Sequence, residues 1–330
     1  MSFFRWLTAC VVISIPLTAS AQNAAPAPRE IVIGLASNAL GTAGPRLANE
    51  LGIFERKGLS VGFVSMDSAN AATTALISGS MKVVMSGPGE EVAAQGRGQK
   101  VVAIANTFAG MGGSLVVSRA AIEKLGIAVD APVAQRLKAL DGLLIASPSA
   151  TSAYTISYRG ALKDVGANVR LTYMAQPIMA AALESGAIQA YIASAPFWAG
   201  PVVRGAGVLW ISGPRGDLPA QLTPSSSGTM QMMRDTAEAN RNLVAKLNDG
   251  LAEFQAALNE RPEAVRAALA KLYPDLDAAT LDLLFKAEAP GWETRPLTAK
   301  DMEREIAFVR ANGFPLPQID AIEPSALLFP

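Results

Sequence analysis

The chain has 330 residues, half of them hydrophobic, with 28 basic side chains, 28 acidic side chains and no histidine. Its balanced charge gives no reason to expect nucleic acid or an anionic membrane surface as a partner. The lack of histidine removes the commonest general base, the commonest metal ligand and every nucleophile pair built on histidine. The length is sufficient for two domains of ordinary size.

The N-terminus reads as a secretory signal peptide over residues 1–21. An apolar run, Leu7–Leu17, follows one basic residue, and Ala19-Ser20-Ala21 fits the small-residue pattern of a cleavage site. We therefore expect export to the periplasm, with an Ala/Pro linker over 22–29. The only cysteine, Cys10, lies in the segment to be removed, so the mature chain would have no thiol and no disulfide. No later stretch is long and apolar enough for a membrane helix.

A strand–helix–strand pattern occurs twice, over 58–90 and over 166–196. In the first copy Ala75-Leu76-Ile77-Ser78-Gly79 ends the helix, and Ala182-Leu183-Glu184-Ser185-Gly186 ends it in the second. Each copy then continues into a short apolar strand and a loop of small residues. Chains that alternate strands and helices resemble one another to some extent, which is the alternative explanation. The other interpretation is a chain of two similar lobes.

The rest of the chain supports an α/β fold with two similar doubly wound lobes joined by two hinge crossings. Lobe one would begin with residues 30–113, lobe two would occupy 114–212, and residues 213–330 would form the return crossing and C-terminal helices packed on lobe one. Strands are predicted at 31–35, 61–63, 81–85, 101–105, 115–118, 143–146, 169–174, 188–193 and 208–211. Helices are predicted at 44–57, 72–77, 90–95, 152–163, 177–184, 232–259, 262–272, 277–286 and 298–310.

Parallel α/β sheets bind ligands at the carboxyl ends of their strands. In this chain those ends carry small or amide side chains and no charge. The expected ligand-binding residues are Ser37, Asn38, Ser86, Gly87, Asn106, Thr107, Ser147, Ser149, Thr151, Ser152, Gln176 and Ser194, with Trp198 as an apolar wall. The serines and threonines at 147–152 can equally well cap the following helix. We expect Ser86-Gly87 and Ser194-Ala195 to lie on opposite sides of one cleft.

Acid–base catalysis has little support in the sequence. Asp67, Glu90 and Glu91 do not form an obvious pair, and the two glutamates occupy a first helical turn, where negative charge is stabilising anyway. We therefore expect no catalytic residue, no metal and no cofactor. The alternative is an enzyme of the same fold that uses a carboxylate base such as Asp67 or Glu91, and a carboxylate inside the cleft would favour it.

Three motifs between Leu47 and Gly98 carry a family resemblance: a helix ending in G-x-F-x-x-x-G-L (Gly52–Leu59), A-L-x-S-G (Ala75–Gly79) and the Gly87-Pro88 loop. The segment resembles periplasmic solute-binding proteins of the aliphatic sulfonate/nitrate/taurine ABC-transporter family, which also includes proteins of thiamine-pyrimidine synthesis and uptake. The resemblance weakens after Gly228. It implies a type II periplasmic binding fold that closes on a small molecule and delivers it to a membrane permease.

In that family the ligand contacts loops corresponding to Ser37-Asn38, Ser86-Gly87, Ser147 to Thr151, and Gln176. This chain departs from an anion-binding pattern because those loops contain no Arg or Lys. It also lacks the histidine and the cysteine-rich motif of the pyrimidine synthases. We expect a monomeric binding protein of an ABC importer for a sulfonate-, nitrate-, pyrimidine- or carboxylate-like solute. A ligand sensor for a membrane receptor is the third alternative.

Overall fold

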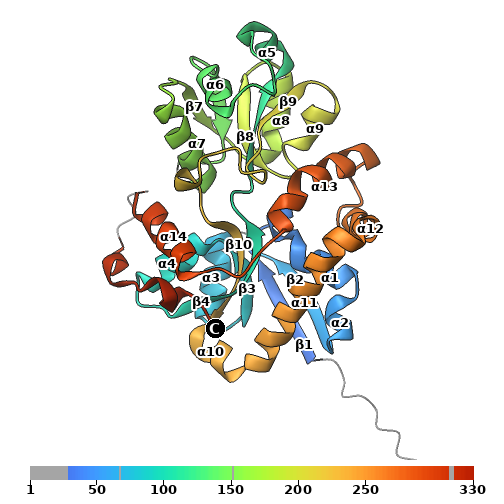
Figure 1. Ribbon diagram of the computed structural model, residues 1–330, viewed down its shortest axis with the longest axis vertical. Coiled ribbons are helices and arrows are strands. Elements are labelled where there is room, and N and C mark those ends of the chain that lie inside the picture. The colour runs from blue at the N-terminus through green and yellow to red at the C-terminus, as the bar shows by residue number, and fades with distance from the viewer. Residues whose placement is uncertain (1–28, 67, 151, 312–315) are drawn as a thin grey trace, which may run out of the picture.

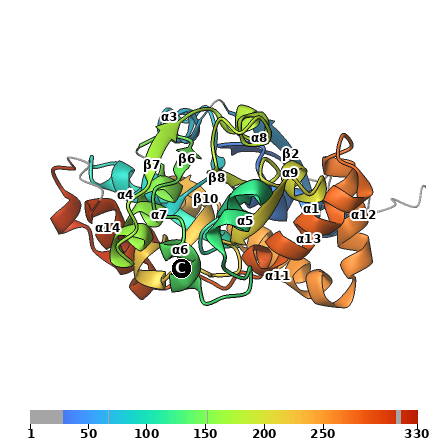
Figure 2. The same ribbon diagram turned by 90° about the horizontal axis from the view of Figure 1, so that it is seen from above.

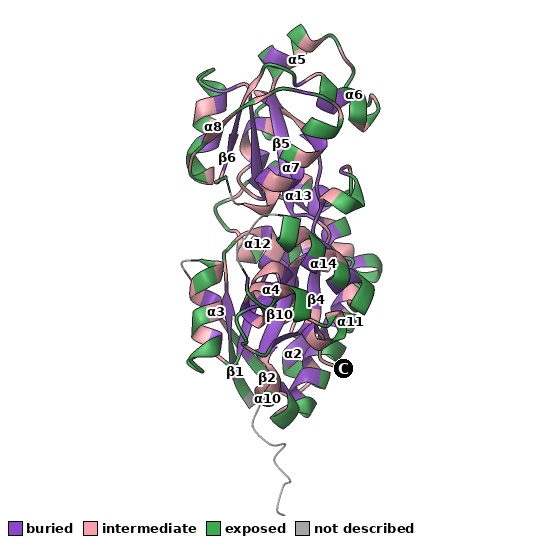
Figure 3. Cartoon of the chain, turned by 90° about the vertical axis from the view of Figure 1, so that its left-hand side faces the viewer, coloured by how far each residue is buried: buried purple, intermediate pink, exposed green. Residues whose placement is uncertain are grey.

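Two lobes stacked along the long axis make up the computed structural model, which describes residues 29–66, 68–150, 152–311 and 316–330 (Figure 1). The expected signal peptide and most of the linker lie outside the described residues, as does Thr151. Each lobe contains one five-stranded sheet with helices on its faces. The strands are largely buried and the outer helix surfaces exposed (Figure 3).

The sheet of lobe one has the strand order β2-β1-β3-β10-β4. Its strands are β1 (Arg29–Leu35), β2 (Leu59–Ser65), β3 (Val83–Ser86), β4 (Val101–Ala109) and β10 (Ser226–Met233). Strand β1 runs parallel to β2 and β3, whereas β10 is antiparallel to both β3 and β4. Helices of the first half of the chain cover this sheet: α1 (Ala43–Glu50), α2 (Ile53–Arg56), α3 (Ala69–Ile77), α4 (Pro88–Gln95) and the 3-10 turn η1 (Leu40–Thr42).

The sheet of lobe two has the strand order β7-β6-β8-β5-β9. Its strands are β5 (Gly113–Ser118), β6 (Leu144–Ser147), β7 (Arg170–Tyr173), β8 (Ala190–Ser194) and β9 (Gly207–Ile211). Here β5 is the antiparallel member, paired with β8 and β9. The surrounding helices are α5 (Arg119–Leu125), α6 (Val133–Lys138), α7 (Ala153–Asp164), α8 (Gln176–Glu184) and α9 (Ala199–Val203).

The predicted repeat is confirmed by this topology. Units β2-α3-β3 and β7-α8-β8 occupy equivalent places in the two strand orders. The glycines that end their helices match in conformation, with φ of 77° at Gly79 and 78° at Gly186. A side chain would be strained at such angles, which explains why the same Ser-Gly pair stops both helices.

Two predicted helices needed correction. The helix expected over 44–57 is divided into α1 and α2, because Gly52 takes a left-handed conformation (φ 67°) between them. The helix expected over 232–259 begins later: Ser226–Met233 is strand β10, followed by α10 (Arg234–Ala239) and α11 (Arg241–Glu260).

The C-terminal helices pack on lobe one as expected, and one of them also reaches lobe two. They are α10, α11, α12 (Pro262–Leu272), α13 (Ala278–Trp292) and α14 (Ala299–Ala311), with the short turns η2 (Ala220–Leu222), η3 (Ile319–Ala321) and η4 (Pro324–Leu327). In Figures 1 and 2, α4 and α14 lie on one side of the molecule and α12 and α13 on the other. Helix α13 packs against α9 of lobe two as well as α12.

A backbone hydrogen bond and buried tryptophan side chains join the two lobes on the α13 side. The Leu40 N–H of lobe one donates to the Ala195 carbonyl of lobe two at 3.1 Å, and Trp292 Nε1 donates to the Leu40 carbonyl at 3.0 Å. Trp198, fully buried, belongs to the same apolar cluster as Phe254 of α11. The lobes are therefore in apolar contact along one side, while the polar cavity described next lies between them near α4 and α14.

Candidate functional site

A cavity of about 560 Å³ is bounded by both lobes and by the chain that crosses between them. Lobe one contributes Gly87–Glu90 from the start of α4, and lobe two contributes Ser152–Tyr154 from the start of α7. The return crossing contributes Pro224, the start of β10 contributes Ser226 and Ser227, and α14 contributes Glu305 and Phe308. Because its walls belong to both lobes, any relative movement of the lobes changes the size of this cavity.

The two crossings are themselves hydrogen-bonded to each other beside the cavity. The Gly110 N–H donates to the Ser225 carbonyl at 3.1 Å, and the Ser227 hydroxyl bonds both the Gly110 carbonyl and the Gly112 N–H at 2.8 Å. The first crossing is short: β4 ends at Ala109 and β5 begins at Gly113. These bonds fix the hinge next to the site.

Two of the expected ligand-binding residues, Gly87 and Ser152, line the cavity directly. Two more, Gln176 and Ser194, lie together one hydrogen bond away from it. The Ser194 N–H and hydroxyl both donate to Gln176 Oε1, at 2.7 and 3.1 Å. Ser194 is also hydrogen-bonded to the side chain of Tyr154, which faces the cavity. Of the four residues expected on opposite sides of one cleft, Gly87 lines the cavity, Ser194 is linked to it through Tyr154, and Ser86 and Ala195 do not line it.

Ser86, on β3, and Thr107, on β4, are both buried in lobe one, 3 % exposed each. Neither hydroxyl has a hydrogen-bond partner among the described residues. Thr107 packs tightly against β10, since a Cβ placed on Gly228 would lie 2.8 Å from its hydroxyl oxygen. These hydroxyls therefore belong to the interior of the lobe rather than to an open loop.

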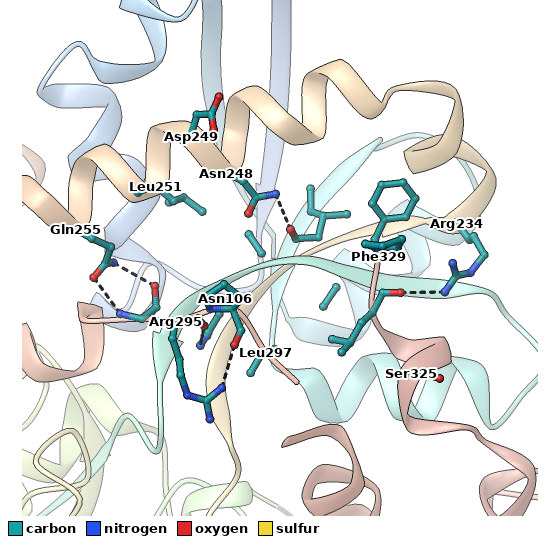
Figure 4. Close-up of a pocket in the computed structure, with 18 residues that line it drawn as sticks. Asn106, Arg234, Asn248, Asp249, Leu251, Gln255, Arg295, Leu297, Ser325 and Phe329 are labelled. Carbon is teal, nitrogen blue, oxygen red and sulfur yellow. Dashed lines mark hydrogen bonds between the residues drawn. The ribbon is translucent and has the colours of Figure 1, made fainter. Parts of the chain in front are cut away.

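Asn106 and Thr107 do not form a strand-end loop, contrary to the sequence expectation. Strand β4 continues to Ala109 because β10 pairs with it, with Thr229 opposite Asn106. The Asn106 amide donates to the Arg295 carbonyl and its Oδ1 accepts from the Ser226 hydroxyl, both at 3.0 Å. Asn106 borders a different cavity, on the outer side of lobe one (Figure 4).

That outer cavity of about 1010 Å³ is larger but lies within one lobe. Figure 4 shows its polar side chains engaged with neighbouring groups: Asn248 Nδ2 donates to the Ile104 carbonyl at 2.9 Å, and Gln255 pairs with Thr294. Lobe movement would leave its walls unchanged. The smaller interlobe cavity is therefore the better candidate for a site coupled to closure.

The remaining expected residues make local contacts. Ser37 and Asn38 are exposed, and the Asn38 carbonyl accepts from the Tyr273 hydroxyl at 2.9 Å. Ser147 is fully buried and hydrogen-bonded to the Thr155 hydroxyl, which also donates to the Ser149 carbonyl at 2.6 Å. Ser147 and Ser149 are therefore tied to the first turn of α7 through Thr155, whereas the N-cap residue of that helix, Ser152, makes no side-chain capping bond.

Trp198 is fully buried and does not face the cavity. Its indole N–H donates to Glu288 Oε1 of α13 at 3.3 Å, across the boundary between the lobes. Glu288 is 1 % exposed, and its burial raises its pKa to about 8. Trp198 thus helps to hold the lobes together on the α13 side.

Sequence reasoning missed the charged groups of the cavity. Glu90, expected to have a structural role, lines it beside Glu305, which is 2 % exposed. Burial raises the pKa of Glu90, and it raises that of Glu305 to about 7 despite hydrogen bonds that Glu305 accepts from the N–H and hydroxyl of Ser225. Glu91 lies behind them, fully buried, with its pKa raised by desolvation and by the Glu305 charge.

Tyr154 was missed as well, although it stands in the first turn after the serine-rich segment that had been singled out. Its ring packs on Gly113, where an added Cβ would lie 2.5 Å from Tyr154 Cγ. Burial, with the charges of Glu288 and Glu90, raises its pKa to about 12, so the hydroxyl stays protonated at neutral pH. The signal that could have found it is an aromatic residue directly after a strand-end loop.

The described residues contain no cluster of three or more acidic, Cys or His side chains placed to hold a metal. No helix in the part of the chain that the structure describes is long and apolar enough to cross a membrane. The cavity is lined by carboxyl, hydroxyl, amide and backbone groups, by the Arg97 side chain and by the rings of Tyr154 and Phe308.

Several chains of known structure share the fold. The periplasmic aliphatic sulphonate binding protein SsuA from Escherichia coli superposes with a TM-score of 0.66 at 18% identity, covering 91% of this chain and 99% of that one. The periplasmic nitrate-binding protein NrtA from Synechocystis PCC 6803 gives 0.59 at 13% identity, covering 92% and 88%. The desulfurization enzyme DSZB gives 0.58 at 13% identity, covering 91% and 97%. At these identities the likeness establishes the fold alone, that of type II periplasmic binding proteins.

Among curated proteins, none matches the chain in sequence. A family model does: that of the NMT1-like family matches residues 25–273, which include both sheets and both crossings but not α13 and α14. The sulphonate-binding and nitrate-binding proteins named above share the fold of this chain, in agreement with the resemblance in its N-terminal half. The chain therefore belongs to the NMT1-like family, with the two-lobed architecture of periplasmic solute-binding proteins.

Proposed function

We propose that the chain is an exported, monomeric binding protein that captures a small polar organic solute between its lobes and delivers it to an ABC permease. The observation that carries the proposal is the cavity lined by α4 and α14 on one lobe, α7 on the other, and the return crossing. A solute that contacts both lobes stabilises the closed arrangement over the open one, which is the condition for ligand-driven closure.

The chemistry of the cavity suits binding. Its hydroxyl and backbone groups can exchange water for hydrogen bonds to a solute, and Tyr154 and Phe308 supply apolar surface. Delivery to a permease is supported by the solute-binding proteins among the structural neighbours. Location in the periplasm is supported by the signal sequence at residues 1–21.

The test begins with protein isolated from the periplasm of the expressing bacterium without refolding. Native mass spectrometry should detect a bound small molecule, and X-ray scattering should show that the chain expands when that molecule is removed. Ala153→Phe, which fills the lobe-two side of the cavity, should abolish co-purification. Ala120→Phe, at an exposed position of α5, should leave it intact. Protein that carries no solute and keeps its dimensions would contradict the proposal.

An enzyme of the same fold is the second candidate, and one observation favours it. Glu305 lines the cavity with a pKa of about 7, the range in which a carboxyl works best as a general acid or base at neutral pH. The desulfurization enzyme with this fold shows that the architecture is compatible with catalysis. Incubating the co-purified solute with the protein separates the two: an unchanged solute mass supports binding, and a product that disappears in Glu305→Gln supports catalysis.

A further inference from the structure

We propose that the interlobe cavity selects a cationic or neutral solute rich in N–H donors, such as an amine or amidine, over a sulfonate, nitrate or carboxylate. The inference rests on the proposed binding function and adds the charge of the ligand to it. It follows from three features: the charges of the side chains that line the cavity, the direction of the helices that begin there, and the Tyr154 ring that lobe two contributes.

The ionisable groups lining the inner part of the cavity are carboxyls. Glu90 stands in the first turn of α4, and Glu305 faces it from α14, where its Oε1 lies 3.6 Å from the position a Cβ on Gly89 would take. Arg97 also lines the cavity, but it is exposed and follows the last turn of α4. Seven residues of helix correspond to about 10 Å, beyond the screening length of about 8 Å at physiological salt. Arg97 therefore offsets the carboxyls weakly.

Helix dipoles oppose this charge and are smaller. Helices α4 and α7 both begin at the cavity, and each N-terminus carries roughly half a positive charge. The two N-termini together supply about one positive charge, against two carboxyls, Glu90 and Glu305. When both carboxyls are ionised, the cavity is therefore favourable to a cation.

The pKa shifts of the two carboxyls agree with this balance of charges. Burial raises the pKa of Glu90 and of Glu305, and the charge of Glu90 adds to the rise at Glu305. A bound cation would relieve that repulsion and favour both ionised forms, whereas an anion would add a further negative charge to it. Two carboxyls that stay protonated would offer O–H donors to neutral and anionic acceptors alike. The preference for a cation therefore comes from the ionised forms, which a cation favours and an anion disfavours.

Lobe two contributes a feature that suits the same class of ligand. Tyr154 lines the cavity opposite α4, with its hydroxyl tied to Ser194 and its ring seated on Gly113. A protonated nitrogen over a tyrosine ring is attracted by the electrons of the ring face. A flat cation held between Glu90 and Tyr154 would therefore contact both lobes at once, which couples its charge to closure.

Three probes of one shape test the inference: benzamidine, benzamide and benzoate, which carry positive, zero and negative charge at pH 7.5. Isothermal titration with the full-length mature protein, after removal of any co-purified solute, should give benzamidine a dissociation constant at least tenfold lower than benzoate. Benzamide should lie between them. Glu90→Gln and Glu305→Gln should each reduce the ratio of the benzoate to the benzamidine dissociation constant severalfold. Glu303→Gln, at an exposed position of α14, the helix that carries Glu305, should leave this ratio unchanged.

Glu305 is the more deeply buried residue, so circular dichroism must first show that Glu305→Gln folds. If Glu305→Gln does not fold, Glu90→Gln, at a half-buried position, provides the second variant. Benzoate binding as tightly as benzamidine, or failure of benzamidine to bind, would overturn the inference. Its failure is distinguishable from that of the proposed function: an anionic solute co-purifying with the protein overturns the charge preference and leaves the binding role intact.

Discussion

Replacing Glu288 by glutamine should stabilise the protein increasingly as the pH rises. Glu288 lies on α13, 1 % exposed, where its carboxyl accepts a hydrogen bond from the Trp198 indole of lobe two. Burial raises its pKa from 4.5 to about 8. Glutamine has nearly the same shape and keeps an oxygen acceptor for Trp198, but it cannot ionise.

The sign and size of the effect follow from proton linkage. Between pH 4.5 and about 8 the unfolded chain has lost the Glu288 proton while the folded chain retains it. The free energy of unfolding of the wild type therefore falls by about 1.4 kcal/mol for each pH unit in this window, relative to a group that does not titrate. The full penalty of the buried carboxyl, reached above pH 8, is about 5 kcal/mol.

Urea unfolding followed by tryptophan fluorescence at pH 5, 6.5 and 8 measures this difference. The Glu288→Gln variant should match the wild type near pH 5 and exceed it by several kcal/mol at pH 8. Glu293→Gln, at the exposed position that follows α13, should match the wild type at every pH. A difference between wild type and Glu288→Gln that does not change with pH would refute the reasoning.

Three further predictions concern other contacts. Tyr154→Phe removes the hydrogen bond to β8 and should cost about 1 kcal/mol of stability, measured by thermal unfolding, while weakening benzamidine binding. Gly291→Ala places a Cβ 2.2 Å from the ring of Phe108 and should cost about 1–3 kcal/mol, with Phe108→Leu in the same chain restoring part of it. Asp301→Asn breaks the paired 2.7 Å contacts with Arg295. Because these contacts lower the pKa of Asp301, the substitution should reduce the free energy of unfolding at pH 6. This destabilisation should vanish as the pH falls well below 3.8, where the wild-type carboxyl is protonated too.

The repeat was predictable from sequence because its signals are local. Helix α3 begins after Ser68, whose side chain accepts from the Ala71 N–H at 3.1 Å, and it ends at Gly79 in a left-handed conformation. Helix α8 has the same Ser-Gly stop. The apolar stripe of α11 is a local signal of the same kind, and the leucines and Phe254 that form it are buried.

Strand β10 could not be recognised in the same way. Its residues are buried on both faces of a central strand, so no alternation of polar and apolar side chains marks it. Two of its polar side chains donate to β3 and to the residue after it: Thr229 to the Ser86 carbonyl at 3.2 Å and Gln231 to the Gly87 carbonyl at 2.9 Å. Both partners are distant in sequence. With β10 missed, the extension of β4 through Asn106 and Thr107 was missed too.

The candidate site was predictable where it follows strand ends and not where distant segments converge. Gly87 and Ser152 lie at the starts of α4 and α7, as the rule for parallel sheets requires. Glu305 reaches the cavity only because α14 packs against α4, a contact between segments more than two hundred residues apart. The spacing of apolar residues in α14 predicts that one of its faces is buried, but it does not identify the element that packs against that face.

The most direct test of the interlobe site is the crystal structure of the protein isolated from the periplasm with its solute bound. We predict electron density for the solute between the first turns of α4 and α7, in contact with the Glu90 carboxyl and the Tyr154 side chain. Density in the outer cavity beside Asn248 and Arg295, with the interlobe cavity filled only by water, would contradict the account.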